Sequence, residues 1–410
     1  MLFLSVVITY LDRSNLSIAA TDLAGDLHLD AKHLGFIFSA FGWAYVFTQI
    51  PGGWVVDRVR PRVLYALICG LWSAATFLQG FAGTFLGLFA LRLMLGMFEA
   101  PAYPIYNRVV TMWFPDRERA AAIAVYTSGQ FVGPAFLMPL LVLTQKNFGW
   151  PTVFILTGAV GLCWAASWYL FYRDPAQATG VNEAEMRSIR EGGGLADLDA
   201  AKAAATPYTW ADFGVVFGSR KLWGIYIGQM AINSTLWFFL TWFPTYLVKY
   251  RHLDFIQAGF LSSLPYLAAF GGVLCSGFLS DSLIKRGFSA TLARKAPIIA
   301  GLLLSMCVVG ANYVSNPKLI VMFMVIAGFG NGFSSIAWVM VSSLAPKKLV
   351  GLTGGAFNFL GNISSIAVPI IIGLLVHGDN FEPALIFVSA VALVGALSYI
   401  FLVGRVERVA

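Results

Sequence analysis

The sequence GWVVDRVRPR, residues 53–62, joins a Gly-x-x-x-Asp turn to a run of basic residues. Long apolar runs lie on both sides of it, so it marks the point where one membrane-spanning helix ends and the next begins. A second Gly-x-x-x-Asp, in GFLSD at residues 277–281, is again followed by basic residues. Likewise, WFPDRER at residues 113–119 has a counterpart in APKK at residues 345–348. These matches predict two halves of similar organisation.

The composition of the chain points to a membrane protein. Of the 410 residues, 58% are hydrophobic and only 11% are charged, and the mean hydropathy is +0.75. Soluble proteins carry about 25% charged residues. A soluble enzyme, a disordered chain and a disulfide scaffold are therefore excluded. Because a spanning helix needs about 20 residues, twelve would occupy roughly 240 positions and leave room for loops and one longer connector.

Hydropathy and the placement of Gly, Pro and charged residues predict an all-α polytopic membrane protein with twelve transmembrane helices. The spans are 1–21, 34–56, 62–82, 85–108, 119–145, 150–172, 222–248, 256–281, 295–314, 318–343, 351–376 and 382–404. They form two pseudo-symmetric six-helix bundles, 1–172 and 222–410, joined by a polar linker at 173–221. Parallel repeats with a substrate held between them at mid-membrane are typical of secondary transporters.

The basic residues predict how the chain is oriented in the membrane. The loops at one side, together with the linker and the C-terminal tail, hold 20 of the 27 Lys and Arg residues. The other side holds five, namely Lys32, Lys146, Lys249, Arg251 and Lys318. This bias predicts that both termini and the linker are cytoplasmic. It also explains the net charge of +7 without a nucleic-acid partner.

The N-terminus and the Cys and His residues add three expectations. The chain has no basic stretch before its first apolar run, so we expect no signal peptide. It begins almost inside a helix, so we expect the natural protein to start earlier. The four cysteines lie in apolar runs and the four histidines near loops, so we expect neither a disulfide nor a metal site.

Four charged residues lie deep inside the predicted spans: Asp12 and Arg13 on the first, Arg92 and Glu99 on the fourth. Each costs about 2.5–3.5 kcal/mol at a helix centre, so these residues must pair or face water. Intramembrane ionisable residues are functional candidates. Arg92 and Glu99 share one helical face with Gly96 and Tyr103 by their spacing. A buried structural ion pair is the alternative interpretation.

Neutral polar and aromatic residues recur at helical spacing in other spans. We expect one group of them to line a central cavity, and this group consists of Gln130, Trp338 and Asn358. We expect another group to hold helices together, and this group consists of Ser342, Asn362 and Ser365. Two guanidinium groups opposite hydroxyl, amide and aromatic groups suit a small organic anion that carries hydroxyl groups.

The two acids predict coupling to protons. A carboxylate beside Arg is stabilised in its charged form by that cation. Substrate binding to the Arg would withdraw this partner, so anion binding and proton uptake should be linked. The residues therefore predict proton-coupled anion symport with no cofactor other than the proton.

The chain resembles the anion:cation symporter branch of the major facilitator superfamily. Residues 53–62 approximate the loop signature of the superfamily, with Arg60 where Gly is common. The branch is indicated by YLDRSN at 10–15, QIPGGW at 49–54, the stretch 92–101 and GLTGGAFNFLGN at 351–362. Within the branch, the likeness is greatest to bacterial galactonate and glucarate transporters.

The resemblance implies roles for individual residues. Asp12 and Glu99 would be the titrating acids, and Arg13 and Arg92 their charge partners, with at least one of the two on the substrate carboxylate. The other residues at the substrate site would be Tyr10, Tyr45, Gln130, Trp338 and Asn358, with Ser335 nearby. Asp57, Arg58, Arg62 and Asp281 would belong to the cytoplasmic gate. We also expect a monomer in the bacterial inner membrane.

Several alternatives remain open at this point. The chain has no His-Glu-x-x-His, Gly-x-Ser-x-Gly or phosphate-binding loop, which argues against a membrane enzyme and an ATP-driven pump. A passive channel does not require titratable acids beside Arg, so these residues argue against a channel. A carrier of aromatic or dicarboxylic acids, of the phthalate or tartrate type, is the second interpretation. An anion exchanger is a further one.

Overall fold

The computed structural model describes residues 1–56, 58–178, 180–194 and 209–409 of the chain. Within these ranges the secondary structure is helical, and the only β-type pairing is an isolated bridge between His377 and Asn380. The predicted all-α fold is therefore confirmed. Asp57, which we predicted to be part of a gate, lies outside the described residues.

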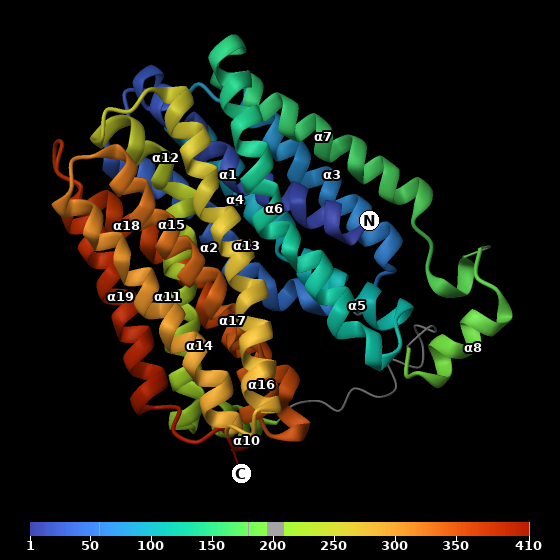
Figure 1. Ribbon diagram of the computed structural model, residues 1–410. Coiled ribbons are helices and arrows are strands. Elements are labelled where there is room, and N and C mark those ends of the chain that lie inside the picture. Colours follow the sequence, from blue (N-terminus) through green and yellow to red (C-terminus); the bar gives the residue numbers. More distant parts are fainter. Residues whose placement is uncertain (57, 179, 195–208, 410) are drawn as a thin grey trace.

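In the described part of the N-terminal half there are seven helices, drawn from blue to green in Figure 1. They are α1 (Leu2–Asp26), α2 (Ala31–Val56), α3 (Pro61–Gln79), α4 (Phe85–Glu99), α5 (Ala102–Trp113), α6 (Asp116–Phe148) and α7 (Trp150–Phe171). A short turn η1 (Pro175–Gln177) and two short helices follow, α8 (Glu183–Glu191) and α10 (Trp210–Gly218). Both short helices lie within the segment that we predicted to be the linker.

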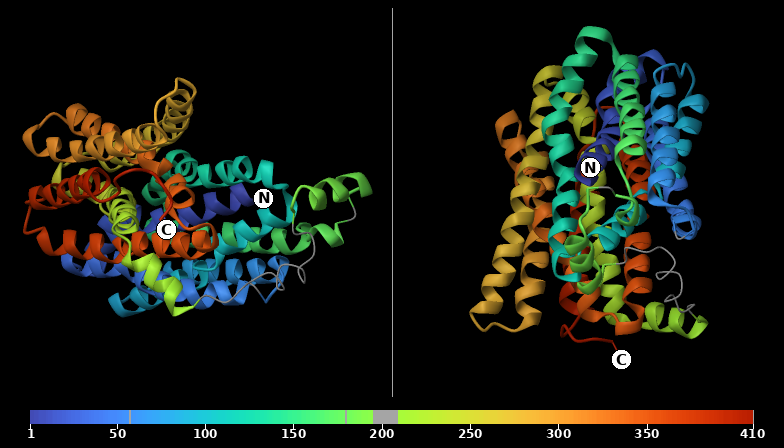
Figure 2. Two further views of the ribbon diagram at one scale, coloured as in Figure 1. Left: turned by 90° about the horizontal axis from the view of Figure 1, so that it is seen from below. Right: turned by 90° about the vertical axis from the view of Figure 1, so that its right-hand side faces the viewer.

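The C-terminal half is drawn from yellow-green to red and stands beside the first half (Figures 1 and 2). Its elements are α11 (Arg220–Thr241), α12 (Phe243–Thr245), η2 (Tyr246–Tyr250), α13 (Phe255–Lys285), α14 (Ala290–Ser305), η3 (Met306–Tyr313), α15 (Pro317–Phe333), η4 (Ser334–Ile336), α16 (Ala337–Leu344), η5 (Lys347–Leu349), α17 (Val350–Asn362), α18 (Ser364–Leu375) and α19 (Glu382–Phe401). We call the end with α8, α10 and the C-terminus the linker end, and the opposite end the far end.

The helices have the length and composition of membrane spans. Nine helical segments of the described chain are long and apolar enough to cross a bilayer. Three more helices have 25, 26 and 22 residues, namely α1, α2 and α11. At 1.5 Å per residue, each of these also exceeds the bilayer core of about 30 Å. Together they account for the twelve predicted spans, so the chain is a polytopic membrane protein.

Several predicted spans are interrupted. The span expected at 85–108 divides into α4 and α5 at Ala100 and Pro101, because proline has no N–H to donate and restricts the residue before it. Tyr103, two residues beyond this break, still lies close enough to Arg13 to interact with it electrostatically. In the tenth predicted span, Ser335 lies in a 3-10 turn, η4. Ser335 and Trp338 therefore do not lie along one straight α-helical face.

The two halves are in contact near the far end of the molecule. On α2, Phe38 packs its ring edge-on against Trp242 of the C-terminal half, with 5.4 Å between centroids. At Gly42 the helices α2 and α18 approach so closely that a Cβ atom would lie 2.4 Å from the Ser365 hydroxyl oxygen. A residue other than glycine would therefore separate the halves at this point.

Candidate functional site

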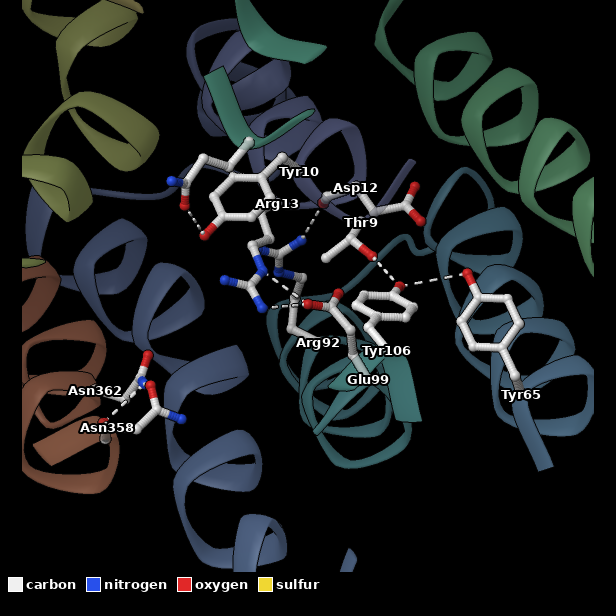
Figure 3. A network of polar contacts seen from close by, with 11 residues as sticks. Thr9, Tyr10, Asp12, Arg13, Tyr65, Arg92, Glu99, Tyr106, Asn358 and Asn362 are labelled. Carbon is white, nitrogen blue, oxygen red and sulfur yellow. Dashed lines mark hydrogen bonds and ion pairs between the residues drawn. The ribbon is translucent and has the colours of Figure 1, made fainter. Parts of the chain in front are cut away.

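The four intramembrane charged residues lie close together on α1 and α4 of the N-terminal half (Figure 3). All four are at most 4% exposed. The guanidinium group of Arg13 on α1 donates from Nε to the Glu99 carboxylate on α4 over 2.7 Å, and its Nη2 lies 2.5 Å from the same oxygen. The structure thus joins one predicted titrating acid directly to one predicted substrate-binding cation.

Arg92 has a different environment from Arg13. Its Nη1 donates to the backbone carbonyl of Asp12 over 3.2 Å, so Arg92 ties α4 to α1. Among the described residues, its Nε has no hydrogen-bond partner. Arg92 and Glu99 also attract each other electrostatically. Arg92 therefore links α4 to α1, and its Nε can still donate a hydrogen bond to another acceptor.

Asp12 faces away from the Arg13–Glu99 pair. Figure 3 shows its carboxyl group turned to the other side of α1, as expected for neighbouring residues that lie about 100° apart on a helix. Within the described chain, neither carboxylate oxygen has a hydrogen-bond partner. The indole of Trp72 on α3 lies beside it. The two predicted acids thus occupy different environments.

Arg13 is surrounded by aromatic rings. Its guanidinium carbon lies 4.8 Å from the ring centroid of Tyr10, 4.8 Å from that of Phe41, 5.0 Å from that of Tyr45 and 5.9 Å from that of Trp237. Ring faces attract cations at these distances. Trp237 belongs to the C-terminal half, so Arg13 lies where the two halves meet.

Polar groups flank this aromatic cage. The Tyr10 hydroxyl donates to the side-chain carbonyl of Gln130 on α6 over 3.1 Å. Nearby, the Tyr126 hydroxyl donates to Asn107 over 2.7 Å. The structure therefore brings Tyr10, Tyr45 and Gln130 to the predicted site beside Arg13.

A glycine allows α4 to reach this position. A Cβ atom on Gly96 would lie 2.2 Å from the carbonyl oxygen of Phe41 on α2. No side chain fits in that space, so glycine lets the α2 and α4 backbones touch. Because Glu99 follows one turn later on the same helix, this contact helps to place its carboxylate against Arg13.

The predicted residues of the C-terminal half lie apart from the Arg13–Glu99 pair. In the described structure, no hydrogen bond or ion pair links Ser335, Trp338 or Asn358 to that pair. Trp338 is 49% exposed and packs edge-on against Phe357 at 4.9 Å. The Asn358 side chain accepts from Asn362 over 3.0 Å, and Figure 3 shows both on the other half.

Three of the predicted gate residues, Arg58, Arg62 and Asp281, lie at the linker end of the molecule. Arg62 donates to the carbonyl oxygen of Tyr169 over 3.0 Å and stacks on its ring at 4.7 Å, so it ties α3 to α7. Arg58 follows the end of α2. Asp281 is exposed, and α13 continues beyond it to Lys285 instead of ending there.

Sequence reasoning missed two residues of the aromatic cage, Phe41 and Trp237. A signal for both exists in the sequence. Phe41 lies four residues before Tyr45, and Trp237 lies four residues after Asn233 on a polar stripe of its own helix. Residues at this spacing share a face, so these rings could have been placed beside the residues that were named.

Metal ligands do not cluster in the described part of the chain, where no group of three or more His, Cys, Asp and Glu side chains is arranged to hold an ion. The site consists instead of two cations, two acids, aromatic rings and amides. These groups can bind an anion and exchange protons.

Known proteins with similar sequences cover essentially the whole chain. Residues 2–369 match the Major Facilitator Superfamily. A D-galactonate transporter of Escherichia coli is 52% identical, with 100% of this chain and 95% of the relative aligned. A probable galactarate/D-glucarate transporter of Bacillus subtilis, GudP, is 44% identical over 100% of this chain and 92% of the relative.

Solved structures with the same fold are more distant in sequence. A bacterial homologue of the human lysosomal transporter Spinster matches with a TM-score of 0.73 at 16% identity, over 98% of this chain and 93% of that chain. At this identity the likeness concerns the fold alone. It agrees with the helical architecture described above.

Proposed function

Because the chain belongs to the Major Facilitator Superfamily and is therefore a transport protein and not an enzyme, we propose that it imports a sugar-acid anion together with protons. The substrate would be a hexonate or an aldarate, such as galactonate or glucarate. The relatives named as galactonate and galactarate/D-glucarate transporters, at 52% and 44% identity, support this substrate class.

One observation carries the proposal: a buried arginine at the meeting point of the two halves. Arg13 is ion-paired to Glu99 and lies against Trp237 of the opposite half. A guanidinium group binds a carboxylate through two parallel hydrogen bonds. The hydroxyl of Tyr45 and the amide of Gln130 would bind the hydroxyl groups of the substrate.

Glu99 would couple this binding to protons. The Glu99 carboxylate and the substrate carboxylate compete for the same guanidinium group. Protonation of Glu99 releases Arg13 to the substrate, and bound substrate in turn favours the protonated acid, because linkage is reciprocal. Asp12 would be the second titrating acid. Proton and anion would then be loaded and released together.

Alternating access would bring the second half to the substrate. Ser335, Trp338 and Asn358 lie on that half, and we propose that they close on the substrate when the halves rock together. Arg92 braces α1 through the carbonyl of Asp12, so Arg13 is the better candidate for the substrate carboxylate. If affinity survives Arg92→Ala but not Arg13→Ala, this assignment holds.

The proposal also covers the membrane in which the protein lies and its orientation there. The excess of Lys and Arg on one side supports cytoplasmic termini. Because the relatives are bacterial, we propose the inner (cytoplasmic) membrane of a bacterium. Transport would run from the outside to the cytoplasm. We propose a monomer, because each chain supplies both halves of the site.

The test is uptake of radiolabelled galactonate and glucarate into proteoliposomes, with and without an inward proton gradient. We expect accumulation that needs the gradient and collapses with a protonophore. Accumulation of phthalate or tartrate instead would assign the carrier to aromatic or dicarboxylic acids. Uptake that needs a counter-anion inside and ignores the gradient would identify an exchanger.

A further inference from the structure

A row of polar side chains runs through the interior of the N-terminal half, on the side of α1 opposite Arg13. We call it the α3 stripe, and it consists of Cys69, Ser73, Thr76 and Gln79. All four are completely buried. Their spacing of four, three and three residues places them on one face of α3. Polar side chains are costly in the core of a membrane helix, so a complete polar face calls for an explanation.

The α3 stripe faces polar groups on two other helices. Asn15 on α1 lies one turn beyond Asp12, and its amide donates to the Thr157 hydroxyl on α7 over 3.1 Å. The Cys69 thiol donates to the Gly161 carbonyl on α7 over 3.7 Å. The helices α1, α3 and α7 thus enclose a line of buried polar groups, and Cys69 in this line interacts electrostatically with Asp12.

Many atoms of this line lack hydrogen-bond partners in the described structure. They are both carboxylate oxygens of Asp12, the Asn15 carbonyl oxygen, the hydroxyl oxygens of Ser73 and Thr76, and the Gln79 carbonyl oxygen. Buried polar groups normally find a partner, and ordered water is the usual one where no protein group is in reach. Water molecules held between such hydroxyl and amide groups form the kind of chain along which protons move, because each water can accept one proton and release another.

The direction of the line follows from the ends of the helices. Gln79 is the last residue of α3 and borders the loop at the far end. Ser73 lies six residues earlier, or about 9 Å along the helix axis, and Asp12 lies deeper still. The groups around Asp12 on its other sides are Arg92 and Glu99 from α4, which belong to the substrate site.

We propose that the α3 stripe is a proton route from the far end of the bundle to Asp12, separate from the substrate site beside Arg13. This inference rests on the proposed function. A proton from water at the far end passes along water molecules that the hydroxyl and amide groups of the stripe hold in place by hydrogen bonds. It ends on the Asp12 carboxylate, which becomes neutral. Because Asp12 and Arg13 are adjacent but face opposite ways, one helix would carry the proton path on one face and the substrate on the other.

The tests are Ser73→Ala and Thr76→Val, which remove hydroxyl groups at nearly constant side-chain volume. We expect the initial rate of proton-driven galactonate uptake to fall about tenfold, the rate equivalent of one lost hydrogen bond. Galactonate counterflow at equal pH needs no net proton movement and should stay within about twofold of the wild-type rate. Thr76→Ser keeps the hydroxyl group and should keep the wild-type rate.

The control is Thr144→Val on α6, where an exposed hydroxyl bonds only its own helix. Counterflow also reports folding, so a variant that misfolds loses both activities and is replaced by Gln79→Met. If Ser73→Ala, Thr76→Val and Gln79→Met all behave like the control while the wild type accumulates galactonate on a proton gradient, the route is wrong and the symport stands. If the wild type itself ignores the gradient, the proposed function fails and the route with it.

Discussion

Replacing Glu99 by Gln tests the competition for Arg13 most sharply. The substitution keeps the size of the side chain but removes the charge that Arg13 contacts at 2.5 Å. Loss of one partner from a buried ion pair costs about 3–5 kcal/mol. The variant without substrate should therefore unfold at a lower temperature than the wild type.

Bound substrate should restore the stability that the variant loses, because it supplies a new carboxylate partner for Arg13. In the wild type the substrate carboxylate must displace Glu99 from Arg13, whereas in Glu99→Gln the guanidinium group is available. A hydrogen bond to a charged group is worth about 1.5–3 kcal/mol, so we expect the variant to bind galactonate about ten to a hundred times more tightly. Its affinity should no longer rise as the pH falls, and proton-driven accumulation should be lost while counterflow remains.

The assays are calorimetric titration with galactonate at several pH values and thermal unfolding with and without galactonate. Glu382→Gln is the matched control, because Glu382 is exposed at the start of α19. A Glu99→Gln variant that binds galactonate more weakly than the wild type, or that still concentrates it on a proton gradient, would refute the competition.

Three further predictions concern other parts of the molecule. Arg13→Lys keeps the charge but loses the paired hydrogen bonds of the guanidinium group, so galactonate affinity should fall at least about tenfold in the same titration; unchanged affinity would make Arg92 the ligand. Gly96→Ala places a Cβ atom 2.2 Å from the Phe41 carbonyl, so the unfolding temperature should drop and uptake should be lost; a variant with normal stability would contradict the close approach. Burial raises the pKa of the Asp174 carboxyl above its usual 3.8, so its ionised form destabilises the fold above that pH. Asp174→Asn should therefore unfold at a higher temperature than the wild type at pH 7, with the difference shrinking toward pH 4, and a difference that is independent of pH would exclude titration of this group.

The fold could be predicted from the sequence because the membrane imposes simple rules. Apolar runs long enough to cross the bilayer, and signatures repeated at residues 53–62 and 277–281, suffice to predict twelve spans in two halves. The breaks were harder to foresee. Pro101 is visible in the sequence, but prolines also lie inside unbroken helices, as Pro134 does in α6. Whether a proline divides a span depends on the packing around it.

The charged residues of the candidate site could be predicted from the sequence, but the pairs that they form could not. Buried ionisable residues are so unfavourable in a membrane that Asp12, Arg13, Arg92 and Glu99 stand out. Which acid meets which base depends on how α1 and α4 are rotated and on the contact at Gly96. The sequence also could not show that Asp12 faces α3, because that orientation arises only when α1, α3 and α7 pack together.

Proton movement driven by substrate alone tests proton-coupled symport most directly. Proteoliposomes with a trapped pH-sensitive dye and no initial pH gradient receive an inward gradient of galactonate. We expect the lumen to become acidic in the wild type, and we expect Glu99→Gln to abolish this change. Galactonate entry without any change in the pH of the lumen would contradict proton-coupled symport.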